Sequence, residues 1–475
     1  MEQGKLSWRV KIGYGVGHLA PSTPYNLLLI YFVLFLTIAG VAPATAGLIG
    51  AIAVLWDAII NPFIGSLSDN YVTEKGRRLP WMKLSLIPMA ILVYLMFAPF
   101  TFPSAGLQIV YYLLVGCLAW TTYSTFVVPY YAMAAELTEN YSERNNLRLT
   151  AMIGGYFCVL LALSGPAYII EAAAVGDGME WLNRTSWGNI GIVFGIFALI
   201  TGIVTLLMLS GSEKEAIKTA LEAKKEEIKL NFVNEWVACL KIKTFRRVLL
   251  WTAVYVLGLS PLTTVFVFLL TFNAHMSAGE QGTFWIIYNL AIIAALPIIT
   301  WFANKFGKKP AMIGAFLPMT IISLYYYFAG VNNIVDAYIF GILWGIVVGV
   351  YYTFYVAKAY DCVEISEFLT GTRQEGSMVA LTLFVMKIAM AIGIFATGWV
   401  LGLTGYDAEA LEQTESAVHG ILALAALAPA IFTGISVIIL FFYPVSKKKF
   451  ELLCAAVEKK RAGEEYSTEG FEDIL

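Results

Sequence analysis

Long apolar runs alternate with short polar segments along the whole chain. A helix needs about 20 apolar residues to cross the roughly 30 Å of hydrocarbon in a bilayer, and each of these runs reaches that length. The pattern therefore predicts an all-α membrane protein with twelve transmembrane helices in two six-helix bundles. The runs lie at 13–38, 44–68, 81–102, 105–136, 147–172 and 187–210, and then at 248–273, 280–303, 309–330, 334–360, 377–405 and 417–443.

Composition agrees with that pattern. Of the 475 residues 59% are hydrophobic and only 13% are charged, whereas an ordinary soluble domain carries about a quarter charged residues. The first run is too long for the core of a signal peptide and lacks a small-residue cleavage pattern, so we expect it to be a retained span. The net charge of −2 gives no basic footprint for nucleic acid.

Several chemical classes find no support in the sequence. The five cysteines are scattered without a CxxC pair, so neither a zinc site nor a disulfide framework is predicted. No Walker loop, HExxH helix or nucleophile elbow interrupts the runs, and we therefore expect no enzyme and no catalytic residue. Energy for any transport would come from a gradient, and the only cofactor expected is a coupling ion, sodium or proton.

The longest polar stretch, residues 212–247, divides the chain. It is rich in Ala, Glu and Lys, which favours a helix along the membrane face. We expect an N-terminal bundle at 1–211, this cytoplasmic linker, a C-terminal bundle at 248–445 and a cytoplasmic tail at 446–475. The turns GSLSDNYVTEKGRR at 65–78 and WFANKFGKK at 301–309 indicate an internal duplication, although a chance match of short basic turns remains an alternative.

Basic residues gather in the loops of one side, and this asymmetry sets the orientation of membrane proteins. The opposite loops are acidic except for Arg184. Both termini are therefore expected in the cytoplasm, with the protein in the inner (plasma) membrane. The basic loop residues are Lys75, Arg77, Arg78, Arg144, Arg148, Lys305, Lys308, Lys309, Arg373, Lys447, Lys448 and Lys449.

Two charged residues lie deep within the runs. Asp57 is about 13 residues into the second run and Lys387 about 10 residues into the eleventh, so at about 1.5 Å per residue both reach the middle third of the bilayer. A charge at that depth usually marks a functional site. Asp57 is our candidate for binding the driving cation, with Lys387 balancing its charge or orienting a substrate. The alternative is an ion pair that only holds the halves together.

Polar residues also cluster in the first run, in GYGVGHLAPSTPYN. His18, Tyr25 and Asn26 lie there beside two prolines, so we expect a kinked or locally unwound helix. Its polar groups either line a cavity or belong to a structural kink. Aromatic residues such as Tyr131 and Tyr352 have rings that suit the faces of sugars, but for any one of them simple packing is the favoured interpretation.

Three long motifs resemble those of the glycoside–pentoside–hexuronide:cation symporter family. They are WDAIINPFIGSLSDNYVTEKGRRLPW at 56–81, PYYAMAAELTENYSERNNL at 129–147 and YDCVEISEFLTGTRQEG at 360–376, the last followed by Lys387. The resemblance spans both halves, roughly residues 10–440. It implies a major facilitator fold, alternating access and a sugar site between the halves.

The resemblance also implies roles for individual residues. Asp57 falls on the family's cation-binding aspartate, with Asn61 and Ser124 at neighbouring ligand positions. Lys387 falls on its central lysine, and Tyr131 and Tyr352 fall where a sugar-transporting member carries aromatic residues; with His18, Tyr25 and Asn26 they form the expected substrate set. The expected cytoplasmic gate, closing through charge pairs, consists of Asp69, Arg77, Glu136, Glu143, Arg144, Asp361, Glu364, Arg373 and Glu375.

The chain departs from the pattern of that sugar-transporting member at four positions. Asn61 replaces a second cation-binding aspartate, Ser124 replaces a threonine, and Leu19 and Val127 replace two sugar-binding aspartates. One carboxylate instead of two weakens a site for a hard cation, so proton coupling is at least as well supported as sodium coupling. A cavity that loses carboxylates and keeps Lys387 favours an anionic substrate, such as a hexuronide or a sulfo-sugar.

Cation symport of a sugar or glycoside is thus our main functional hypothesis. An uncoupled facilitator, in which Asp57 and Lys387 form only a structural pair, is one alternative. A transporter of lysolipids or other amphiphiles is another, because the expected cavity is rich in aromatic residues. We expect a monomer whose partners are a sugar-like substrate and membrane lipids, with no metal site and no nucleic acid.

Overall fold

The computed structural model describes residues 6–70, 73, 76–138, 141–173, 181, 183–212, 232–372, 374–410 and 412–475. Within these residues the chain is helical apart from turns, short loops and an isolated β-bridge between Thr73 and Gly76. Among the described residues eleven helices are long and apolar enough to cross a membrane, and counting a bent pair at the N-terminus as one span gives 12. The predicted all-α membrane fold with twelve spans is confirmed.

The helices follow the predicted runs closely. After the bent pair come α4 (Pro43–Asn70), α5 (Leu79–Phe97), α6 (Ala105–Leu137), α7 (Tyr141–Ala172) and α8 (Arg184–Leu209). The second half contains α11 (Lys243–Phe268) with η2 (Leu269–Asn273), α12 (Ala278–Phe306), α13 (Lys308–Ala329), α14 (Ile334–Thr370), α15 (Glu375–Leu403), and α16 (Glu415–Leu422) continued by η3 (Ala423–Leu427) and α17 (Ala428–Phe441).

Local sequence explains where many helices begin and end. The residue just before a helix often caps it, because its side chain accepts a hydrogen bond from a backbone N–H two or three residues later. Ser104 does so before α6, and Asn333 does so before α14. Gly371 ends α14 with φ +70°, a backbone conformation that favours glycine. The two duplicated turns share this device, because Gly76 and Gly307 both have positive φ.

The first span is interrupted twice. It consists of α1 (Trp8–Gly17), α2 (Leu19–Ile30) and α3 (Phe32–Ile38), and the chain bends by 53° between Ile30 and Phe32. The predicted kink exists, but its sharp bend lies at Tyr31 rather than at the prolines. Pro21 falls in the first turn of α2, where a missing N–H costs no helical hydrogen bond. Tyr31 is fully buried and donates a hydrogen bond to the Leu163 carbonyl of α7.

The chain divides into two compact units. The first holds Met1–Glu226 with Thr264–Ile286 and Ile394–Gly420, and the second holds Glu227–Thr263, Ile287–Gly393 and Ile421–Leu475. Each unit is described by itself below. The predicted boundaries of the two bundles, the linker and the tail stay predictions.

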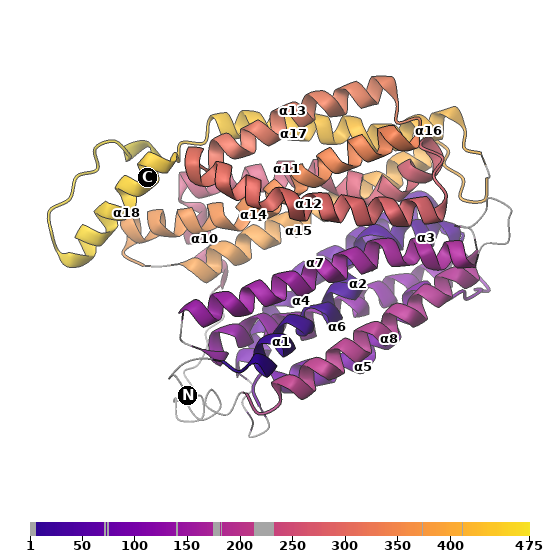
Figure 1. The fold of residues 1–475 in the computed structure, drawn as a ribbon, viewed down its shortest axis with the longest axis horizontal. Helices are drawn as coiled ribbons and strands as arrows, with labels where there is room; N and C mark the ends of the chain where they lie inside the picture. The colour runs from indigo at the N-terminus through magenta and orange to yellow at the C-terminus, as the bar shows by residue number, and fades with distance from the viewer. Residues whose placement is uncertain are drawn as a thin grey trace. The chain divides into compact units, whose positions relative to one another are not determined.

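Close helix contacts build the first unit. α5 and α8 lie side by side (Figure 1), and glycines of α8 allow their backbones to touch: a Cβ at Gly195 would lie 2.7 Å from the Ala90 carbonyl oxygen. Such small-residue contacts are typical of helices that pack within a membrane. A buried cluster contributed mainly by α5 and α6, with further residues from α7 and α8, includes Tyr14 and Tyr130, which stack at 4.4 Å between ring centroids.

Several helix ends contact one another within the first unit, on the side that the charge pattern predicts to be extracellular. Gly47 near the start of α4 meets Gly398 near the end of α15, and a Cβ on Gly47 would lie 2.8 Å from the Gly398 Cα. Between α7 and α12, Glu171 accepts a 3.0 Å hydrogen bond from the Gly279 backbone, and the Tyr168 and Thr283 hydroxyls lie 3.0 Å apart. We call these two contacts the outer seal.

The second unit contains the C-terminal segment. Helix α18 (Lys447–Ala462) runs beside α14, and Arg461 forms a bidentate pair with Glu367 at 2.6 and 2.7 Å. Phe471 and Ile474 are buried in the same cluster as residues of α11 and α14. Helix α10 (Phe232–Leu240) lies in the predicted linker, and the last linker residues, 243–247, belong to α11. Residues 213–231 of that prediction lie outside the described residues.

Candidate functional site

Asp57 of α4 is fully buried and is the centre of the candidate cation site. Ser124 of α6, also fully buried, donates a hydrogen bond to Asp57 Oδ1. Asn61 lies one helical turn after Asp57, and its Nδ2 donates to the same oxygen over 3.2 Å. Residues four apart share one face of a helix. The structure therefore brings together all three residues that were predicted to bind the cation.

Asn61 supplies a further oxygen to this group. Its side-chain Oδ1 is buried, and within the described residues no donor reaches it. A buried carbonyl oxygen without a hydrogen bond is unfavourable, and a cation would satisfy it. Carboxylate, hydroxyl and amide oxygens are the ligands that hard cations prefer. The group can thus hold a cation between α4 and α6, and the carboxylate alone can take up a proton.

His18 lies at the interruption between α1 and α2, and both of its ring nitrogens are engaged. Nε2 is 2.8 Å from the Tyr131 hydroxyl of α6, and Nδ1 is 2.7 Å from the Ser22 hydroxyl one turn later. Gly155 of α7 lets the ring approach, because a Cβ there would lie 3.1 Å from Nδ1. Tyr131 is 53% exposed, so this polar pair faces out of the protein core.

The other residues predicted in the first span have different surroundings. Asn26 is buried and its amide donates 2.7 Å to the Ser22 carbonyl of its own helix, so this donor is used locally. Tyr25 packs in an aromatic group with Trp120 and Tyr123, with ring centroids 5.3–5.6 Å apart. Asn26 therefore fits the structural alternative, because its amide donor is used within the irregular helix, and the lining of a cavity by His18 and Tyr25 stays a prediction.

The predicted substrate residues of the second unit lie on α14 and α15. Tyr352 is 43% exposed and meets Tyr351 and Tyr355 at 5.3 and 5.9 Å between centroids. Lys387 is half-buried on α15. Because Asp57 belongs to the first unit and Lys387 to the second, their pairing stays a prediction.

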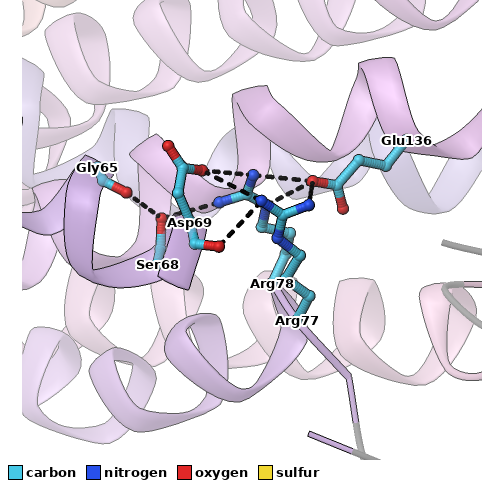
Figure 2. A network of polar contacts seen from close by, with 6 residues as sticks. All are labelled: Gly65, Ser68, Asp69, Arg77, Arg78 and Glu136. Atoms are coloured by element: carbon cyan, nitrogen blue, oxygen red, sulfur yellow. Dashed lines mark hydrogen bonds and ion pairs between the residues drawn. The ribbon is translucent and has the colours of Figure 1, made fainter. Parts of the chain in front are cut away.

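Three predicted gate residues, Asp69, Arg77 and Glu136, meet in one network within the first half (Figure 2). The guanidinium of Arg78 lies at its centre and contacts Glu136 at 2.8 Å, Asp69 at 2.6 Å and the Ser68 hydroxyl at 2.9 Å. Arg77 reaches the same Glu136 oxygen at 3.3 Å. Burial by itself would lower the pKa of Arg78, but the hydrogen bonds and charges of Glu136 and Asp69 outweigh it and raise the pKa. The network ties the ends of α4, α5 and α6 together.

The remaining gate candidates also have partners within their own unit. Glu143 bonds Lys11 of α1 at 2.8 Å, Asp361 bonds Lys308 at 2.6 Å, and Glu364 lies 3.8 Å from Arg461. Glu375 lies exposed in the first turn of α15. The Arg144 side chain and Arg373 lie outside the described residues. Pairing of these groups across the two halves stays a prediction.

Two functional candidates escaped the sequence reasoning. Arg78 was noted only as a loop charge, yet it is the most buried arginine of the network in Figure 2. Lys358 of α14 is buried in a predicted span and lies 3.6 Å from the centre of the Tyr443 ring. The signal for Lys358 was available, since the rule that selected Asp57 and Lys387, a charge within an apolar run, applies equally to it.

Comparison with known proteins places these features in a wider set. A family described as "MFS/sugar transport protein" matches residues 13–447. The chain is 26% identical to the glucuronide carrier protein homolog of Escherichia coli (strain K12), covering 96% of this chain and 97% of that protein. It is 25% identical to the isoprimeverose transporter of Lactiplantibacillus pentosus, covering 98% and 94%.

Solved structures give the same picture of the fold. An inward-facing bacterial homologue of the human lysosomal transporter Spinster superposes with a TM-score of 0.65 at 13% identity, covering 93% of this chain and 98% of that one. At that identity the likeness shows the fold alone. The relatives and the fold belong to transporters and not to enzymes.

Proposed function

The chain belongs to the MFS/sugar transport protein family, and from this premise we propose that it is a secondary active transporter that moves a sugar or glycoside together with a cation. The observation that carries the proposal is the buried group of Asp57, Asn61 and Ser124. A carboxylate at the middle of a membrane span is costly to keep charged. A coupling ion that binds there offsets this cost, and the site is then neutral when it is loaded.

Either sodium or a proton suits this site. Sodium would use the carboxylate of Asp57, the Ser124 hydroxyl and the free Oδ1 of Asn61, three protein oxygens where hard cations usually take six or more ligands. A proton needs only the carboxylate. Because the site has a single acidic group and few other oxygens, it suits a proton better than sodium. Imposed gradients distinguish the two ions.

The substrate class rests on His18, Tyr131 and Lys387. A polar pair such as His18 and Tyr131 would be unfavourable against lipid tails, so its exposed side belongs in a water-filled cavity. Hydroxyl and imidazole groups bind sugar hydroxyls, and the ammonium group of Lys387 would attract a carboxylate or a sulfonate. The relatives' names, a glucuronide carrier homologue and an isoprimeverose transporter, support a glycoside, including an anionic hexuronide or sulfo-sugar.

Alternating access follows from the two ends of the fold. The outer seal joins α4 to α15 and α7 to α12, and with both termini in the cytoplasm these helix ends face outside the cell. Transport would require the seal to open, and the charged network in Figure 2 would then lie at the side that closes.

Proteoliposomes with imposed gradients test the proposal. The substrate panel would contain a neutral xyloside, a glucuronide, a sulfo-sugar and a lysophosphatidylcholine, each under a sodium gradient, a proton gradient or neither. We expect uphill accumulation of a sugar-containing substrate under one gradient and its loss in Asp57→Asn. Asp407→Asn, which changes an acidic residue in a loop, is the matched control and should accumulate normally.

Other outcomes identify the alternatives. Equilibration without accumulation under either gradient, unchanged in Asp57→Asn, would show an uncoupled facilitator. Accumulation of the lysophospholipid and of no sugar would assign an amphiphile as the substrate. Either result would overturn the sugar symport proposal.

A further inference from the structure

A pocket of about 240 Å³ opens on the first two turns of α11. It is lined by Lys243, Arg246, Arg247 and Leu250, which recur at the three- and four-residue spacing of one helix face. All four side chains are exposed. A water occupies about 30 Å³ of liquid, so the pocket has room for a polyatomic group. It lies in the second unit, and none of its lining residues is among those assigned above to the cation or the substrate.

Three cations share this pocket without a counter-charge from the described part of the chain. Within those residues the side chains of Lys243, Arg246 and Arg247 make no hydrogen bond and no ion pair. By contrast, two other basic side chains of the second unit have acidic partners: Lys308 bonds Asp361, and Arg461 bonds Glu367. Like charges on adjacent turns repel, and the partial positive charge at the start of α11 adds to the unfavourable energy. An anion in the pocket would relieve both effects.

The pocket is bounded by apolar surface on one side. Leu250 is 55% exposed, and Val254 and Leu257, which follow it on the same face of α11, are partly exposed. The preceding helix α10 exposes Val237 and Leu240. A ligand that binds here should have an anionic group, which contacts the three cations, and a hydrocarbon chain, which lies along Leu250, Val254 and Leu257.

We propose that this pocket binds the phosphate of an anionic phospholipid from the cytoplasmic leaflet, with an acyl chain lying along Leu250, Val254 and Leu257. Arginine is suited to this task because its planar guanidinium grips phosphate oxygens in pairs. Clusters of basic residues just cytoplasmic of a transmembrane helix are a known means of recognising acidic lipids. The inference relies on the proposed topology and is independent of the transported substrate.

Native mass spectrometry and thermal unfolding of the full-length protein in detergent test this site. Phosphatidylglycerol is titrated as the anionic probe, and phosphatidylcholine is the zwitterionic comparison. We expect one saturable phosphatidylglycerol adduct and a rise in the unfolding midpoint that phosphatidylcholine does not produce, because a ligand of the native state stabilises it. In the double variant Arg246→Gln with Arg247→Gln the apparent affinity should fall at least tenfold.

The control removes the same charge elsewhere. Lys448 and Lys459 are exposed on α18, and Lys448→Gln with Lys459→Gln should keep the adduct. If both double variants lose phosphatidylglycerol binding equally, the effect is general surface charge and the site is refuted. Inorganic phosphate or glycerol 3-phosphate producing the full thermal shift would indicate a soluble ligand and would likewise overturn the lipid assignment.

A third variant covers the case in which the glutamine changes prevent folding. Arg246→Lys with Arg247→Lys keeps the charge but removes the paired hydrogen bonds. It should retain the adduct with several-fold weaker binding. Affinity equal to the wild type would contradict recognition by the guanidinium groups. A photoactivatable phosphatidylglycerol should label residues around Leu250 in the wild-type protein, and labelling confined to other helices would also contradict the proposal.

Discussion

Ser124 donates a hydrogen bond to the carboxylate of Asp57 and thereby joins α6 to α4 inside the first unit. Both side chains are fully buried. The candidate cation site is therefore shared by two helices of one half rather than confined to a single helix. A change in the charge of Asp57 would therefore alter its hydrogen bond with α6, the helix that also carries Tyr131.

Replacing Asp57 tests the coupling most directly. In Asp57→Asn the site can no longer gain or lose a charge, so uphill accumulation should disappear. Exchange of substrate down its gradient should survive, because exchange does not require the empty carrier to return. Counterflow and gradient-driven uptake in the same proteoliposomes measure the two activities, and full accumulation by the variant would remove Asp57 from the mechanism.

Ser124 should tune cation affinity without being essential. A hydrogen bond to a charged group contributes about 1.5–3 kcal/mol and favours the ionised carboxylate. Ser124→Ala should therefore raise the half-saturating sodium concentration roughly tenfold or more if sodium is the coupling ion, and should lower the half-saturating proton concentration if the proton is. Ser124→Thr keeps the hydroxyl and should stay close to the wild type. The measurement is initial uptake against cation concentration. Equal affinities in the wild type and Ser124→Ala would show that the hydroxyl is not part of the cation site.

The outer seal should respond to a side chain at Gly398. In Gly398→Val the added atoms meet the α4 backbone around Gly47, so the closed outer arrangement should be disfavoured. A cysteine placed at Thr283 should then react faster with an impermeant thiol reagent added from outside. Gly376→Val is the control, because an added Cβ at Gly376 would have no atom within 4 Å, and it should leave the reactivity unchanged. Unchanged reactivity in Gly398→Val would argue against the seal.

Arg78 should matter more for stability than Arg77. Its guanidinium side chain is only 5% exposed and binds two carboxylates, and breaking one side of a buried ion pair costs about 3–5 kcal/mol. Arg78→Ala should therefore lower the thermal midpoint clearly more than Arg77→Ala, whose side chain is 24% exposed. Thermal unfolding of the two purified variants compares them. An equal loss would show that the network is not centred on Arg78.

Acidic pH should weaken the contact between α1 and α7. The hydrogen bond from Lys11 lowers the pKa of Glu143 below its ordinary value of 4.5. Because the folded-state pKa is the lower one, the contribution to stability is present above pH 4.5 and is lost as the pH falls through the folded pKa. The difference in thermal midpoint between the wild type and Glu143→Gln should accordingly shrink towards zero in acid. A difference that stays constant with pH would contradict this role.

The sequence predicted the fold well and the site in part. Twelve apolar runs became twelve spans because hydrophobic length alone determines which segments a bilayer accepts. Asp57, Asn61 and Ser124 also came together as expected, since one helix turn and one neighbouring helix connect them. The family resemblance was confirmed by a match over residues 13–447.

Other features depended on tertiary contacts that no local pattern contains. The bend of the first span follows from the burial of Tyr31 against α7, whereas the sequence pointed to Pro21 and Pro24. The partner of Glu143 is Lys11, far away in the sequence, and Arg461 reaches Glu364 from the C-terminal segment. Long-range partners of this kind are chosen by packing, so a list of charged positions could name the candidates without pairing them.

The contact between Gly47 and Gly398 affects the free energy of closing and opening the outer seal. Where two helices meet through glycine backbones, no side chain has to give up rotamer freedom when they close. For long side chains that loss amounts to about 1.5–2 kcal/mol each. A seal made of glycine can therefore form and part repeatedly at little entropic cost, and closure and opening can stay nearly balanced in free energy, as a carrier that must return on every turnover requires.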